Sequence, residues 1–167
     1  MSLKKITTTR SALVSAFMLC LFLTMTLGRL ELGSKITKTS VATWYQTLHK
    51  PWFTPPDFVF NPIWAFLYIT MAVAAWLVWR RFESPLRREA LVVFTLQLML
   101  NLAWSALFFG LQRIDLALME LLILQGLVIY TWLRFRAIDR RAGFLFLPYT
   151  IWVGFAVALN TGIWILN

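Results

Sequence analysis

The feature that most constrains this chain is a series of five long apolar runs, each close to the length of a membrane span. The 167 residues are 60% hydrophobic and 14% charged, and a soluble domain of this size could not bury so much apolar surface. The runs cover residues 11–28, 58–79, 90–109, 116–135 and 143–166. We therefore predict an all-α integral membrane protein, with residues 1–167 forming one five-helix bundle.

The segment between the first two runs, residues 29–57, is predicted to be a long structured loop. Prolines at positions 51, 55 and 56 oppose a continuous helix there, because proline lacks an N–H and pushes the preceding residue toward extended conformations. The same segment is too aromatic to be a solvated linker. Its aromatic residues are Trp44, Tyr45, Trp52 and Phe53. We expect this loop to pack as a cap over a functional site.

The basic residues predict the orientation of the bundle. With five spans, eleven Lys and Arg residues fall on the side of the N-terminus and five fall on the other side. The positive-inside rule therefore places the N-terminus in the cytoplasm and the aromatic loop outside. The first run follows Lys4, Lys5 and Arg10 as a signal peptide would, but no small-residue cleavage site follows it, so we expect it to be retained.

Polar residues inside the runs are expensive in hydrocarbon and need a reason. Gln97, Asn101 and Trp104 are spaced by four and three residues, so they share one helix face. They either hydrogen-bond between helices or line a pocket below the loop. Glu120, one turn inside the fourth run, either lies near the interface, pairs with a polar neighbour or relays protons. Small residues at positions 154, 158 and 162 predict a close helix contact, within the monomer or in a dimer.

The sequence offers little apparatus for hydrolytic or metal-assisted chemistry. It has no Gly-rich phosphate loop, no HExxH and no Ser/His/Asp arrangement. His49 is the only histidine and Cys20 the only cysteine. We therefore expect no metal site, no required cofactor and no disulfide. The net charge of +9 comes from short basic clusters between apolar runs, which is typical of membrane loops and argues against nucleic-acid binding.

Motifs along the whole chain, from about residue 12 to the end, resemble those of one known family. The first is Trp44, Tyr45, Leu48, Lys50, Pro51, Phe53, Pro55 and Pro56, followed by Pro62, Trp64, Leu67 and Tyr68. The later ones are Gln97, Asn101, Trp104, Phe108 and Phe109, then Pro148, Tyr149, Trp152, Phe155, Ala156, Leu159, Asn160, Ile163 and Trp164. Together they resemble the tryptophan-rich sensory protein/translocator protein (TspO/MBR) family, formerly the peripheral benzodiazepine receptors.

The resemblance implies five helices, usually a homodimer, and a pocket that binds porphyrins, haem or other flat hydrophobic ligands. Such a protein would act as a sensor, carrier or scavenger; a small transporter is a weaker alternative. The ligand-binding candidates are Tyr45, Trp44, Trp52, Phe53, Trp64, Asn101, Trp104, Trp152, Phe155 and Leu159. Trp64 and Trp152 match tryptophans proposed for light- and oxygen-dependent porphyrin breakdown in bacterial members, so they are the catalytic candidates. Propionates of a porphyrin would meet Lys50 or Arg29.

The chain departs from the family pattern at several positions. Phe53 replaces the usual tryptophan after Lys-Pro-Ser, and Trp52 replaces the serine. The cholesterol-recognition pattern needs a tyrosine and a basic residue where this chain has Gly162 and Ile165, so we do not expect cholesterol to bind there. The expected location is a bacterial cell membrane, or the outer mitochondrial membrane if the source is eukaryotic.

Overall fold

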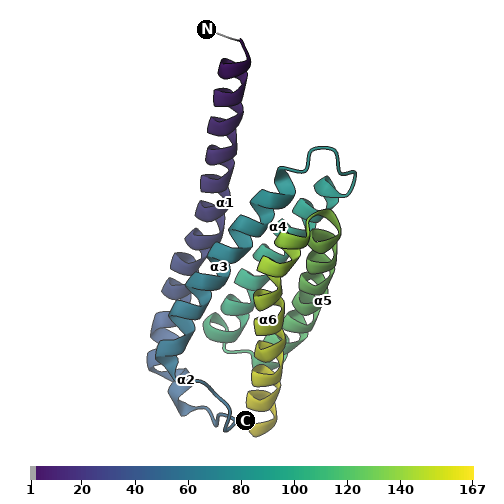
Figure 1. Cartoon of the computed structure of the whole chain (residues 1–167). Coiled ribbons are helices and arrows are strands. Elements are labelled where there is room, and N and C mark those ends of the chain that lie inside the picture. Colours follow the sequence, from purple (N-terminus) through teal and green to yellow (C-terminus); the bar gives the residue numbers. More distant parts are fainter. Residues whose placement is uncertain (1–2) are drawn as a thin grey trace.

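The computed structural model describes residues 3–167, except for the side chains of residues 3–11, 29–36 and 39. These residues form a bundle of helices with the N-terminal end of α1 extending beyond it (Figure 1). The helices in chain order are α1 (Leu3–Ala42), α2 (Trp44–Thr47), α3 (Asp57–Trp79), α4 (Arg87–Ser105), the π-helix η1 (Ala106–Gly110), α5 (Ile114–Ile138) and α6 (Arg140–Leu166). The prediction of an all-α bundle is confirmed.

Four helical segments are long and apolar enough to cross a membrane, which confirms a multi-pass membrane architecture. They are Asp57–Trp79, Arg87–Gly110, Ile114–Ile138 and Arg140–Leu166. Helix α1 contains a shorter apolar stretch, Ala12–Gly28. At about 1.5 Å per residue this stretch rises about 25 Å, less than the roughly 30 Å of a hydrocarbon core.

The predicted loop over residues 29–57 is wrong in its first half. Helix α1 continues without interruption to Ala42. After the turn at Thr43 and the short helix α2, only residues 48–56 form a non-helical loop. The prediction ends the helix where the apolar run ends, at Gly28. A helix can continue beyond its apolar stretch, however, and the first proline of the segment is Pro51, where the chain is indeed non-helical.

Helices α5 and α6 also extend beyond the apolar runs, so that a single residue, Asp139, separates them. Asp139 caps α6 by accepting a hydrogen bond from the backbone N–H of Arg141 at 2.9 Å, and it accepts another from Nε of Arg81 at 2.9 Å. Burial alone would raise the pKa of Asp139. The hydrogen bonds and the positive charge of Arg81 outweigh burial and hold this pKa below its ordinary value.

The half of the bundle next to Asp139, here called the packed half, has a closely filled core. Alanines with no exposed surface let the helices approach one another. They are Ala72, Ala74, Ala75, Ala90 and Ala142. The rings of Phe94, Phe135 and Phe146 fill the space between α4, α5 and α6, with centroids 5.1 to 6.2 Å apart. Close contact of this kind is the main source of stability for helices in lipid.

Candidate functional site

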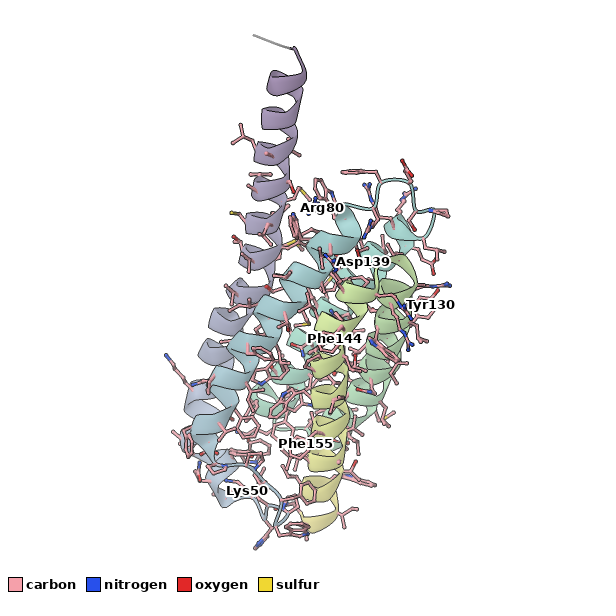
Figure 2. All side chains as sticks on the ribbon, viewed as in Figure 1. Lys50, Arg80, Tyr130, Asp139, Phe144 and Phe155 are labelled. Carbon is pink, nitrogen blue, oxygen red and sulfur yellow. The ribbon has the colours of Figure 1, made fainter. Side chains whose placement is uncertain are left out.

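The other half of the bundle, here called the cavity half, encloses a cavity of about 570 Å³. Its walls come from the C-terminal end of α1, from α2, α3, the end of α4, η1, α5 and α6. On α3, for example, Phe60, Trp64 and Tyr68 line the cavity at helical spacing, and on α6 Trp152, Phe155 and Leu159 do so. Figure 2 shows the aromatic side chains gathered between these helices, near the labelled Phe155.

Aromatic side chains from several helices line the cavity, and their rings pack against one another. The rings of Trp64 and Tyr68 are stacked, with centroids 5.3 Å apart, and the ring of Trp152 lies at 88° to that of Trp64, 6.4 Å away. Across the cavity the rings of Trp104 and Phe108 are stacked at 5.2 Å. Each ring is packed against a neighbour, so the walls are preorganised for a flat apolar ligand.

A chain of buried hydrogen bonds lies at the inner end of the cavity. Tyr68 Oη donates to Asn101 Oδ1 at 3.1 Å, and Asn101 Nδ2 donates to Tyr149 Oη at 3.3 Å. Tyr149 Oη donates in turn to Gln97 Oε1 at 2.8 Å. Both readings of the polar residues on α4 therefore hold in part: Gln97 and Asn101 hydrogen-bond between helices, and Asn101 also lines the cavity.

A second polar link fixes the ring of Trp104. Its indole Nε1 donates to Asn160 Oδ1 at 3.1 Å, and Asn160 Nδ2 donates to the backbone carbonyl of Ile114 at 3.1 Å. This link joins α4, α6 and the start of α5. It satisfies the polar atoms of Trp104 and Asn160 within the bundle and holds the ring in one orientation.

The loop over residues 48–56 is fastened to α6. The backbone N–H of His49 donates to Asn167 Oδ1 at 3.0 Å, and Asn167 Nδ2 donates to the His49 carbonyl at 2.9 Å. Pro51 lies so close to Gly162 that a Cβ at that glycine would come within 2.9 Å of the proline ring. The ring of Phe53 packs against Phe155, 6.2 Å away. Gly162 thus contacts the loop of the same chain.

Charged and polar groups surround the outer end of the cavity. Lys38 and Asp57 line it from α1 and α3. Lys50 does not line it: its Nζ lies over the ring of Tyr45, 4.1 Å from the centroid, and donates to Gln46 Oε1 at 3.4 Å. Burial of Tyr45, assisted by the negative charge of Asp57, raises the pKa of the phenol to about 12, so the hydroxyl is neutral at physiological pH.

Seven of the ten predicted ligand-binding residues line the cavity: Tyr45, Trp64, Asn101, Trp104, Trp152, Phe155 and Leu159. Three do not. Trp44 packs against Phe108 at 5.5 Å, Phe53 lies behind Phe155, and Trp52 is 94% exposed. Phe53 and Trp52 face α6 and solvent because the loop is fastened to α6, whereas Trp44 lies on α2 and packs against η1. The side chain of Arg29 lies outside the described residues.

Sequence reasoning missed several residues that line the cavity. They include Lys38, Asp57, Phe60, Asn61, Ser105 and Phe108. Lys38 lies in the part of the predicted loop 29–57 that is helical in the structure, and the candidates from that loop were its aromatic residues. Phe60 and Asn61 precede Trp64 by four and three residues, so helical periodicity could have added them.

The described residues contain no group of three or more His, Cys, Asp or Glu side chains able to hold a metal ion. His49 is exposed, and its described hydrogen bonds are made by its backbone. Glu120 is half-buried on α5 and does not line the cavity. What the cavity presents is therefore aromatic surface with a few neutral polar groups and a charged outer end.

Comparison with known proteins places this arrangement in a family. The chain is 38% identical over 153 residues to the tryptophan-rich protein TspO of Chlorobaculum tepidum, covering 89% of this chain and 94% of that one. It is 40% identical over 136 residues to the tryptophan-rich protein TspO of Archaeoglobus fulgidus, covering 81% and 87%. It is 35% identical over 136 residues to the translocator protein of Bos taurus, covering 80% of each. The model of the TspO/MBR family matches residues 16–165, and the chain belongs to the TspO/MBR family.

Proposed function

We propose that the protein is a membrane-embedded binding protein for flat, hydrophobic tetrapyrroles such as protoporphyrin and haem. The observation that carries this proposal is the aromatic-walled cavity of about 570 Å³. Small-molecule sites typically measure about 300–1,000 Å³ and are mostly apolar, with a few placed polar groups. Stacked pairs such as Trp64–Tyr68 and Trp104–Phe108 offer flat surfaces to a flat ligand.

The names of relatives support a role in sensing or carrying such a ligand. One relative from Cereibacter sphaeroides, 38% identical over 117 residues, is a tryptophan-rich sensory protein, and the bovine one is a translocator protein. Movement of a hydrophobic ligand or sterol across the membrane is the corresponding transport alternative. Ligand flux into sealed vesicles that contain the protein would distinguish transport from binding alone.

We also propose that α1 crosses the membrane, which brings the number of spans to five, and that the N-terminus is cytoplasmic. The Ala12–Gly28 stretch needs only a few flanking helical residues to reach the length of the hydrocarbon core, and α1 continues at both ends. The cations of the packed half, among them Arg80, Arg81, Arg87 and Arg88, support a cytoplasmic position for that end. A bacterial cell membrane and a homodimeric state complete the proposal.

The test is a titration of the purified protein with protoporphyrin IX in detergent, in the dark. Binding in the cavity is expected to quench tryptophan fluorescence, with saturation at one porphyrin per chain. Trp104→Leu removes a wall ring and is expected to weaken binding at least about tenfold. Trp52→Leu is the matched control, since Trp52 lies outside the cavity. Absence of saturable binding would overturn the tetrapyrrole proposal.

A second candidate function is light- and oxygen-dependent breakdown of the bound porphyrin. It is favoured by one observation: Trp64 and Trp152, the two catalytic candidates, both line the cavity, with ring centroids 6.4 Å apart. Illumination of the complex in air tests it. Irreversible loss of the porphyrin absorption band that Trp64→Phe and Trp152→Phe abolish would support an enzyme. Full recovery of the spectrum would support a binder.

A further inference from the structure

The cavity opens to the outside on one side only within the described part of the chain. Six lining residues are exposed: Lys38, Ala42, Gln46, Asp57, Phe58 and Asn61. All six belong to the end of α1, to α2 or to the first turns of α3. The lining residues of α4, η1, α5 and α6 are buried or half-buried. The opening therefore lies between α1 and α3, at the ends of both helices.

The loop over residues 48–56 does not cover this opening. None of its residues lines the cavity. The loop is held on α6 by the paired hydrogen bonds of His49 and Asn167 and by the contact of Pro51 with Gly162. A ligand that enters between α1 and α3 thus passes beside the loop, and the loop need not move.

Among the described side chains, Lys38 and Lys50 are the two lysines near the opening, and they make different contacts. Lys38 is exposed and lines the cavity, one helical turn before Ala42. No ion pair or hydrogen bond joins it to another described side chain. Lys50, in contrast, lies over the ring of Tyr45 and bonds to Gln46, outside the cavity. Asp57, on the α3 side of the opening, accepts a hydrogen bond from Gln46 Nε2 at 3.2 Å.

We propose that the opening between α1 and α3 is the ligand entrance and that Lys38 holds a carboxylate of the ligand there. This inference rests on the proposed function. The apolar plane of the ligand extends inward between the tryptophans, and its anionic end stays at the headgroup level of the membrane. A lysine suits this place because its flexible stem lies along apolar surface while its ammonium donates charge-assisted hydrogen bonds.

The position of Asp57 adds selectivity. Asp57 brings a negative charge to the α3 side of the opening, whereas Lys38 brings a positive charge to the α1 side. The carboxylates of a ligand are therefore attracted to Lys38 and repelled by Asp57. The pair therefore orients a ligand with one acidic edge, such as a porphyrin with both propionates on the same side. Asp57→Asn is expected to tighten the binding of a carboxylate ligand by a few-fold.

The charge test compares protoporphyrin IX with its uncharged dimethyl ester in the dark. For Lys38→Gln we expect about tenfold weaker binding of the free acid and less than a twofold change for the ester. Lys38→Arg should retain affinity for the acid. Lys50→Gln is the matched control and should leave both affinities unchanged. Equal effects of Lys38→Gln on acid and ester, or a larger effect of Lys50→Gln, would overturn the assignment of Lys38.

The entrance is tested by association rates from stopped-flow quenching. Ala42→Trp narrows the opening and is expected to slow association about tenfold, whereas Asn167→Ala, which removes the two hydrogen bonds between Asn167 and the loop, should leave the rate unchanged. Faster association in Asn167→Ala with no effect of Ala42→Trp would place the entrance under the loop. If the unaltered protein binds neither porphyrin, the proposed function fails. If it binds both but these variants behave like it, only the inference fails.

Discussion

The packed half and the cavity half are built from the same helices with different side chains. Helix α3 illustrates the contrast: its first turns carry Phe60, Trp64 and Tyr68 around the cavity, and its later turns carry Ala72 and Ala75 in the closed core. Small residues bring helix backbones together, and stacked rings keep them apart. One half thus supplies the stability that lets the other hold an open space between its helices.

The contrast is strongest for a phenylalanine truncated in each half. Phe94→Ala in the packed half leaves a void beside Phe135 and Phe146 and should lower the free energy of unfolding by about 3–5 kcal/mol. Phe155→Ala enlarges a space that already exists and should cost about 1 kcal/mol. Denaturant titration in mixed micelles measures both. Similar losses would show that the two halves do not differ in packing.

Removal of the cap between α5 and α6 tests the packed half next. Asp139→Ala loses the α6 cap and the bonds from Arg81 and should cost about 2 kcal/mol at neutral pH. Glu83→Ala, at an exposed position, is the control. Because the folded pKa of Asp139 is lowered, its stabilisation is complete above the unfolded pKa of about 3.9 and is lost as pH falls through the folded value. The difference between the parent protein and Asp139→Ala should therefore shrink only in acid.

Filling the cavity with a larger side chain should make the cavity half as closely packed as the packed half. Leu159→Trp places a larger ring in the cavity and should weaken protoporphyrin binding at least about tenfold, or about 1.4 kcal/mol, with the midpoint of thermal unfolding unchanged or raised. Ile123→Trp, at a position 62% exposed, should change neither quantity. Undiminished binding in Leu159→Trp would mean that the porphyrin binds elsewhere.

The smallest expected effect compares two helical glycines. Gly126→Ala meets no atom within 4 Å and should stabilise α5 by up to about 1 kcal/mol, because alanine favours helix. In Gly162→Ala the new methyl group would lie 2.9 Å from the ring of Pro51, so the same helical gain is offset by displacement of the loop. Thermal unfolding compares the two variants. An equal gain at both positions would show that the loop yields freely.

The sequence predicted the helical membrane bundle and most of the aromatic walls, because long apolar runs and residues at helical spacing are local patterns. It did not predict where α1 ends, because the helix continues to Ala42, beyond the end of its apolar run at Gly28, and the end of an apolar run does not mark the end of a helix. Trp44, Trp52 and Phe53 were predicted to bind ligand because aromatic residues seek apolar contact. Where they lie depends on contacts between distant segments, which no local pattern encodes: Trp44 packs against η1, and docking of the loop on α6 places Phe53 against Phe155 and leaves Trp52 exposed.

The two hydrogen bonds between His49 and Asn167 tie the loop over residues 48–56 to the C-terminal end of α6, so the loop is expected to move together with this helix. Any tilt or rotation of α6 that moves Trp152 and Leu159 in the cavity wall would carry residues 48–56 with it, because two hydrogen bonds and the Pro51 contact travel along. A spectroscopic label at the exposed Trp52 position would then report the motion of a wall that is itself hidden from solvent. Movement of α6 at the cavity could thus be followed from a label on the exposed loop, without a label in the cavity itself.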